Sequence, residues 1–164
     1  MSTLRWQPIT TLLLSLVGLG VATYLTIAHF DAHLTLSCPA GGGAIDCEAV
    51  TTSAQSHLFG IPVAVLGLAF FVPMVALCLP AAWRSSHRRI HLARLVLSVT
   101  GIGMIIYLMI AELFIIKKIC LWCSSVHLIT FILFVIVVTA APIVLSPGYG
   151  RSAGEGTHGA SDGE

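Results

Sequence analysis

The sequence is short of charge. Only 9% of its 164 residues are Asp, Glu, Lys or Arg, whereas 57% are hydrophobic. Because soluble domains carry about 25% charged residues, this shortage excludes an ordinary water-soluble domain and indicates an integral membrane protein. The few basic residues form no stripe with interleaved aromatic residues, which excludes nucleic acid as a partner.

Charge is nearly absent from four long stretches. A membrane-crossing helix needs about 20 apolar residues, and a secretory signal peptide would have a shorter apolar region of about 7–15. The predicted fold class is therefore all-α, an integral membrane four-helix bundle with a long external loop that bears cysteines. In the third span, Gly101 and Gly103 are expected to let neighbouring backbones approach closely. The predicted spans cover residues 9–28, 61–79, 95–116 and 121–144.

The spans form one predicted membrane domain, residues 1–145. Its external loop is 30–59, and a short amphipathic helix is expected within it at 48–57. Residues 146–164 are rich in Gly, Ser and charge and have no apolar period. This composition predicts a disordered cytoplasmic tail.

Lysine and arginine are distributed unevenly between the two sides of these spans. The external loop contains neither, while the stretch 81–94 contains four arginines and no acid, and is interpreted as a cytoplasmic loop that determines topology. Six basic residues against two place both termini in the cytoplasm by the positive-inside rule. The six are Arg5, Arg84, Arg88, Arg89, Arg94 and Arg151, and the two on the outer side are Lys117 and Lys118.

Four of the five cysteines form two pairs. Cys120 and Cys123 make a C-x-x-C motif at the first turn of the fourth predicted helix, a spacing that suits a disulfide. The helix N-terminus and the two preceding lysines favour a thiolate there. Cys38 and Cys47 lie in the external loop, so both pairs are predicted to face the same, oxidising side. Cys78 is interpreted as a packing residue.

Two cysteine pairs on one face indicate a relay by thiol–disulfide exchange, from a mobile loop to a rigid pair that a lipid-soluble quinone can reach. Two alternatives remain open at this point. The first is a structural protein in which the pairs are static disulfides that staple the loop to the bundle. The second is a metal-binding or transport protein that uses the cysteines and His127 as ligands, because C-x-x-C is also a zinc-ligand spacing.

One combination of motifs extends beyond the two cysteine pairs. It consists of Cys38, Cys47, Ser53, Gly60-x-Pro62, Gly67 and Cys120-Leu121-Trp122-Cys123. This combination resembles the vitamin K epoxide reductase family in its bacterial branch, over residues of about 9–144. The resemblance implies a membrane thiol oxidoreductase that supports disulfide bond formation, placed in the bacterial cytoplasmic membrane with its redox centres facing the periplasm or exterior.

The resemblance also implies a role for each cysteine. Cys38 would be attacked by a reduced, separate extracytoplasmic thioredoxin-fold (DsbA-like) protein. Cys47 would then attack Cys120 in a Cys120–Cys123 disulfide. Cys123 would face the electron acceptor, a quinone (menaquinone or ubiquinone). Ser53 matches a loop hydroxyl that the family places near the redox centre.

His127 lies four residues after Cys123, where the family often has a tyrosine near the quinone carbonyl. An imidazole there would donate a hydrogen bond or a proton, so Ser53 and His127 are the predicted quinone-binding residues, and no metal site is predicted. The stretch 61–65 lacks the asparagine of animal members, which favours plain quinone reduction over epoxide reduction.

Two further groups of ionisable residues stand near the predicted outer side. Glu112 is interpreted as a proton acceptor for the quinone site or, preferably, as a side chain that reaches the interface or pairs with Lys117 or Lys118. The histidines that flank the external loop are given no role beyond a solvated surface. They are His29, His33 and His57.

Overall fold

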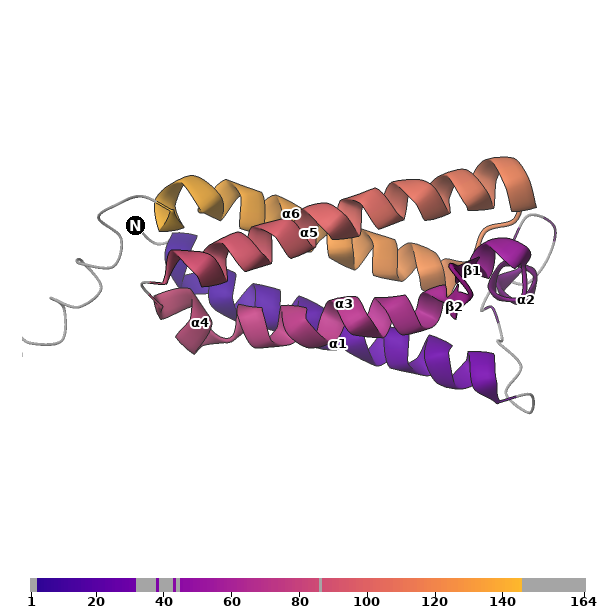
Figure 1. Ribbon diagram of the computed structural model, residues 1–164, viewed down its shortest axis with the longest axis horizontal. Helices are drawn as coiled ribbons and strands as arrows, with labels where there is room; N and C mark the ends of the chain where they lie inside the picture. Colours follow the sequence, from indigo (N-terminus) through magenta and orange to yellow (C-terminus); the bar gives the residue numbers. More distant parts are fainter. Residues whose placement is uncertain (1–2, 32–37, 39–42, 44, 86, 146–164) are drawn as a thin grey trace, which may run out of the picture.

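The computed structural model of the chain describes residues 3–31, 38, 43, 45–85 and 87–145, with side chains from residue 6 onward. The predicted tail 146–164, His33 and part of the glycine-rich loop lie outside this described part. Long helices lying side by side make up most of it (Figure 1). They are α1 (Thr3–Phe30), α3 (Val63–Cys78), α5 (Arg88–Ile110), its π-helical continuation η2 (Ala111–Ile116), and α6 (Leu121–Val144).

Several short elements connect the long helices. Helix α4 (Pro80–Arg84) follows α3. The segment between α1 and α3 holds α2 (Cys47–Thr51), the 3-10 helix η1 (Ala54–Ser56) and an antiparallel hairpin of β1 (His57–Leu58) and β2 (Ile61–Pro62).

The amphipathic helix expected at 48–57 is wrong in its extent. Helix α2 ends at Thr51, and the Ser53 hydroxyl donates a hydrogen bond to the carbonyl oxygen of Val50 at 2.7 Å. Side-chain bonds of this kind compete with continuation of a helix. At the hairpin turn, Phe59 and Gly60 have positive φ angles of 53° and 79°. The chain therefore reverses direction just before α3.

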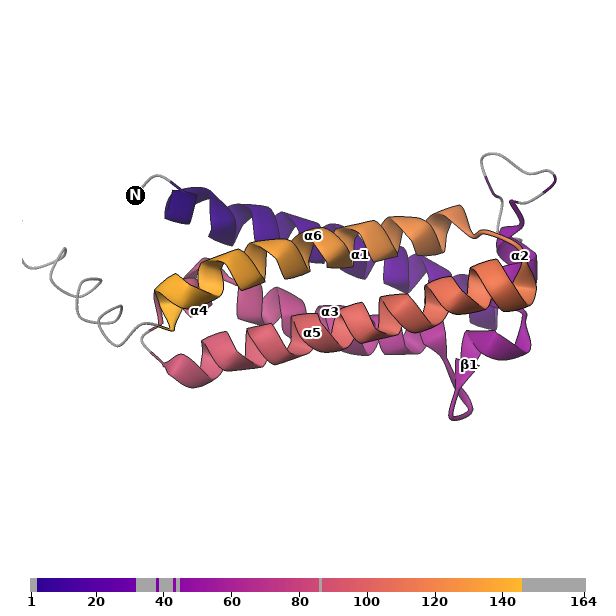
Figure 2. The same ribbon diagram turned by 90° about the horizontal axis from the view of Figure 1, so that it is seen from above.

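Within the described residues, three helices are long and apolar enough to cross a membrane, namely Trp6–Phe30, Arg88–Ile116 and Leu121–Val144. Helix α3 is apolar but has only 16 residues, fewer than the roughly 20 that a crossing requires, so its crossing stays a prediction. Seen from two sides, α4, the start of α1 and the end of α6 lie at one end of the molecule (Figures 1 and 2). Helix α2 and the hairpin lie at the opposite end.

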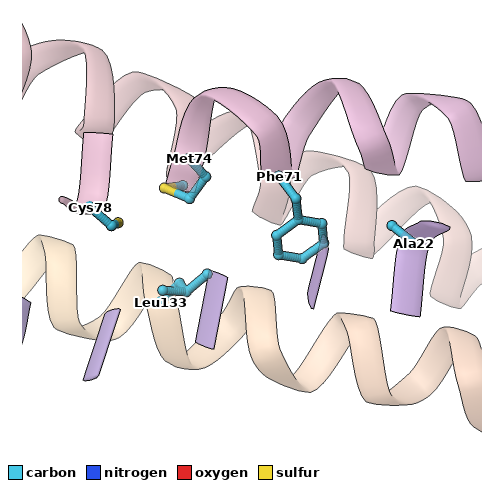
Figure 3. Packing of buried hydrophobic residues seen from close by; sticks show 5 residues of the cluster. All are labelled: Ala22, Phe71, Met74, Cys78 and Leu133. Carbon is cyan, nitrogen blue, oxygen red and sulfur yellow. The ribbon is translucent and has the colours of Figure 1, made fainter. Parts of the chain in front are cut away.

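The main core lies between α1, α3 and α6 (Figure 3). The side chain of Phe71 is fully buried and packs directly on Gly18 of α1, where a Cβ atom would overlap its ring. Cys78 is a free, fully buried thiol in the same cluster, in agreement with its interpretation as a packing residue. The buried members of the cluster are Ala22, Phe71, Met74, Cys78 and Leu133.

The expectation that residues 81–94 form a loop is wrong, because most of this stretch is helical, in α4 and α5. Helix α5 begins at Arg88, so Arg94 lies within a helix and is only 1% exposed. Its guanidinium donates hydrogen bonds to the Leu77 carbonyl oxygen and lies 3.8 Å from the centroid of the Trp83 ring. The break between α3 and α4 leaves that carbonyl oxygen free to accept these bonds. The Leu77 carbonyl oxygen and the Trp83 ring therefore stabilise the buried charge of Arg94 in place of solvent.

The two glycines of α5 differ in their surroundings. A Cβ atom on Gly101 would lie 2.8 Å from Phe70 Cε2 and 2.9 Å from Thr130 Cγ2, whereas one on Gly103 would meet nothing within 4 Å. Side chains of α3 and α6 therefore lie close against Gly101, and the expected close approach is wrong for Gly103.

This difference predicts opposite effects of alanine. Gly101→Ala overpacks the contact and should destabilise the bundle by about 1–3 kcal/mol. Gly103→Ala should leave stability unchanged or raise it by up to about 1 kcal/mol, because alanine favours a helix more than glycine does. Unfolding of the two purified variants in detergent checks this expectation. Equal midpoints would contradict the α5–α6 contact.

Candidate functional site

The chain before α2 is hydrogen-bonded to the chain before α6. Ile45 and Ile119 form a parallel bridge, and the Asp46 backbone N–H donates to the Ile119 carbonyl oxygen at 3.1 Å. In addition, Lys118 Nζ donates to the Gly43 carbonyl oxygen at 2.6 Å. We call these contacts the loop clamp. They hold two segments that are 75 residues apart in the sequence side by side.

Local capping positions one cysteine of each pair beside the loop clamp. The Asp46 side chain caps α2 by accepting the Ala49 N–H at 3.0 Å, which makes Cys47 the first residue of that helix. On the other segment, Cys120 is the N-cap of α6, and its sulfur accepts the Cys123 N–H at 3.3 Å. Both helix starts are therefore fixed within a few residues of the clamp.

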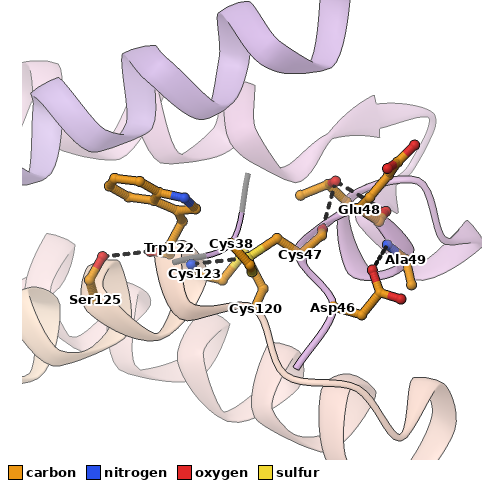
Figure 4. The surroundings of a disulfide bond; sticks show 10 residues. Cys38, Asp46, Cys47, Glu48, Ala49, Cys120, Trp122, Cys123 and Ser125 are labelled. Carbon is orange, nitrogen blue, oxygen red and sulfur yellow. Dashed lines mark hydrogen bonds between the residues drawn. A yellow bond between two sulfur atoms is a disulfide. The ribbon is translucent and has the colours of Figure 1, made fainter. Parts of the chain in front are cut away.

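All four predicted redox cysteines meet in one cluster (Figure 4). Cys47 and Cys120 are 1% and 0% exposed, and Cys38 and Cys123 pack against them. Cys38 and Cys47 form a disulfide with Cα atoms 5.9 Å apart, while Cys120 and Cys123 are free thiols. The cluster thus holds an oxidised pair beside a reduced pair, the arrangement that thiol–disulfide exchange requires.

The Cys120 thiol is more acidic than an ordinary cysteine. A hydrogen bond from the Cys123 thiol lowers the pKa of Cys120, and this effect outweighs the opposing effect of burial. The predicted contribution of the two preceding lysines is not among the causes of this lowered pKa. Lys118 instead donates a hydrogen bond to the Gly43 carbonyl oxygen. A thiolate at Cys120 is therefore favoured mainly by its own motif partner.

A cavity of about 430 Å³ opens next to the cluster, between α1, α3, α5, η2, α6 and the segment from α2 to β1. This volume lies within the range of roughly 300–1,000 Å³ that is typical of small-molecule sites. Most of its lining is aliphatic or aromatic. Cys123, Ser53 and His127 all line it, so the cavity joins one redox cysteine to both predicted quinone-binding residues.

His127 is buried, with 7% of its side chain exposed. Among the residues described here, its Nδ1 atom has no hydrogen-bond partner. Buried polar atoms are rarely left unpaired, so an unpaired nitrogen at a cavity wall is suited to a ligand that brings its own polar atom. Ser53 lines the same cavity, but its hydroxyl proton is directed to the Val50 carbonyl oxygen.

Glu112 is placed differently from the preferred expectation. It is only 4% exposed, lies in η2, and lines the cavity instead of reaching the interface. It makes no ion pair with either described lysine, and its carboxyl group interacts with the backbone N–H of Cys120. The π-helical turn, which spacing alone does not reveal, directs the carboxyl group inward.

His29 lines the cavity as well, which corrects the expectation of a solvated surface residue. It is half-buried, and the centroid of its ring lies 5.2 Å from that of the exposed His57. Its position at the end of α1, far from the C-x-x-C motif in the sequence, carries no sequence signal. Within the described part of the chain, no group of three or more His, Cys, Asp or Glu side chains is placed to hold a metal ion.

Comparison with known proteins agrees with this geometry. The family model of the vitamin K epoxide reductase family matches residues 9–138, which is most of the chain. No curated protein matches the chain. The match covers α3, α5 and η2 in full, most of α1 and α6, and both cysteine pairs. The chain therefore belongs to the vitamin K epoxide reductase family and is a membrane thiol oxidoreductase.

Proposed function

We propose that this protein re-oxidises the dithiol of a separate extracytoplasmic thioredoxin-fold protein and passes the electrons through its two cysteine pairs to a quinone, thereby supporting disulfide bond formation. The convergence of four sulfur atoms beside one apolar cavity carries this proposal. Electrons that enter at the loop pair can pass by disulfide exchange to the adjacent C-x-x-C pair, whose Cys123 lines the cavity.

Each cysteine has a distinct part in this scheme. Cys38 is less buried than Cys47 and is the sulfur for an incoming thiolate to attack, which releases the Cys47 thiolate. Cys47 then attacks Cys120 in an oxidised motif, forming the Cys47–Cys120 bond and releasing Cys123. The second thiolate of the thioredoxin-fold protein then attacks that protein's own sulfur in the mixed disulfide, which releases the Cys38 thiolate and the oxidised thioredoxin-fold protein. Attack by Cys38 on Cys47 restores the loop disulfide and leaves Cys120 and Cys123 reduced, as they are in the structure.

The cavity fits a quinone ring. Its apolar wall suits the ring and an isoprenoid tail, and the unpaired Nδ1 of His127 suits a carbonyl oxygen at its edge. A bound quinone supplies a two-electron, two-proton acceptor. We assign Ser53 to positioning α2 against the cavity and His127 to direct contact with the ring oxygen.

The membrane arrangement remains part of the proposal. Lys118 binds the Gly43 carbonyl oxygen in the loop clamp, beside the cysteine cluster. Helix α4, which ends at Arg84, and the start of α5 at Arg88 lie at the end that holds the start of α1 (Figure 1). By the positive-inside rule this supports cytoplasmic termini and a cysteine cluster on the exterior of a bacterial cytoplasmic membrane. Residues 1–145 would then be one domain with four crossings, α3 providing the short one.

The test is quinone reduction in membrane vesicles that contain the full chain, driven by a reduced thioredoxin-fold protein. Replacing any of Cys38, Cys47, Cys120 or Cys123 by Ser should abolish turnover. Cys78→Ser, which alters a cysteine outside the cluster, should retain it. Full turnover without one of the four cysteines would overturn the relay.

The relay also predicts a trapped intermediate. In Cys38→Ser or Cys123→Ser, the thiolate that would resolve the mixed disulfide is missing, so Cys47 should stay joined to Cys120. Non-reducing peptide mapping by mass spectrometry detects this cross-link. A static staple would give no Cys47–Cys120 peptide in either variant.

His127→Phe should slow quinone reduction by about 10²-fold, because the ring of similar size cannot donate a hydrogen bond or a proton. Exchange with the thioredoxin-fold protein should be unaffected, since His127 lies beyond Cys123 on the cavity wall. His57→Phe, at an exposed histidine of β1, is the matched control. Unchanged turnover in His127→Phe would remove His127 from the site.

The acidity of Cys120 predicts a pH effect with a definite sign. A lowered pKa keeps the thiolate present to lower pH, so loss of the Cys123 donor should raise that pKa and move Cys120 alkylation to higher pH. The comparison is Cys123→Ala against Cys123→Ser, which keeps a donor, in a background with Cys38 and Cys47 changed to Ala. Rates of iodoacetamide labelling of Cys120 against pH should differ, and coinciding profiles would contradict the assigned cause.

A further inference from the structure

An acid stands in the wall of an otherwise apolar cavity. Glu112 is the only carboxylate among the described residues that line it, and its side chain is 4% exposed. Burying an ionisable group inside a membrane-crossing segment costs free energy, so such groups mark functional sites by default. The fold maintains this one beside the redox cluster.

The π-helix η2 explains how the acid enters the cavity. Ala111 and Glu112 are its buried residues, whereas Leu113, Phe114 and Ile115 are exposed on its outer side. π-turns inside longer helices occur frequently at functional sites. A wider turn at this point directs the Glu112 side chain inward and leaves the larger apolar side chains that follow it outward.

Glu112 lies next to the groups that react in the proposed relay. Its carboxyl group interacts with the backbone N–H of Cys120 and acts electrostatically on the thiols of both Cys120 and Cys123. It shares the cavity wall with Cys123 and His127. Neither described lysine neutralises it, as Lys118 binds the Gly43 carbonyl oxygen.

Proton balance requires a carrier at this position. When the sulfurs of Cys120 and Cys123 join, their two S–H bonds are lost and two electrons and two protons are released. Reduction of a quinone to a quinol consumes the same two electrons and two protons. In an apolar cavity the protons need a side chain to move on, and His127 supplies one such group.

We propose that Glu112 is the second proton carrier of the redox site. Its carboxylate takes a proton released by the Cys120–Cys123 dithiol as the disulfide forms, and its carboxylic acid returns that proton to a quinone oxygen, so no net proton leaves the cavity. This inference rests on the quinone-linked relay proposed above and assigns a residue to its last step.

The experiment uses the full chain in detergent with dithiothreitol as reductant and a short-chain quinone as acceptor. Quinone absorbance gives the rate, and acid quenching followed by alkylation and mass spectrometry gives the redox state of Cys120 and Cys123. The variants are Glu112→Gln, which removes the titrating group at constant size, and Glu112→Asp, which keeps it. Glu48→Gln, at an exposed acid of α2, is the matched control.

Glu112→Gln should slow quinone reduction by about 10²-fold and accumulate Cys120 and Cys123 as dithiols, because electrons arrive but cannot leave. Glu112→Asp should restore part of the rate, and Glu48→Gln should match the wild type. A Glu112→Gln variant with wild-type rate and thiol state overturns the proton role. So does a slow variant whose Cys120–Cys123 disulfide can no longer be reduced, since that defect is structural. Failure of the wild type to reduce the quinone overturns the proposed function itself.

Discussion

The arrangement of the site depends on the loop clamp. The clamp joins two segments that lie far apart in the sequence. It consists of the Asp46 N–H bond to Ile119, the Ile45–Ile119 bridge and the Lys118 bond to Gly43. Backbone hydrogen bonds are individually modest, worth roughly 0.5–1.5 kcal/mol each, but they fix register as well as distance. Without this register Cys47 and Cys120 would not be buried against each other.

The two segments that the loop clamp joins are each also fixed by a local helix cap. Asp46 is at once a clamp donor and the cap of α2, so the residue that pairs with Ile119 also sets where Cys47 lies. Cys120 is likewise the N-cap of α6, and this helix packs against α5 and α1. The loop disulfide is thereby held against the C-x-x-C pair at the start of α6.

Within the cluster, position on α6 separates the duties of the two motif cysteines. Cys120 is the cap residue and lies against the loop disulfide, whereas Cys123, three residues later, lines the cavity. The cavity is mostly apolar, and the ionisable side chains of His127 and Glu112 line it together with Cys123. An apolar site of this kind suits the lipid-soluble acceptor proposed above, and its low polarity strengthens the electrostatic interactions of His127 and Glu112.

The sequence by itself determined the membrane class, the C-x-x-C at a helix start and the family, because apolar length and short-range spacing are local properties. The predicted fourth span, 121–144, coincides with α6. Tertiary structure decided which groups meet. It buried Arg94 against Trp83 and the carbonyl oxygen of Leu77, and turned Glu112 into the cavity through a π-turn. Such outcomes depend on carbonyl groups and walls that distant helices supply, and no sequence spacing encodes them.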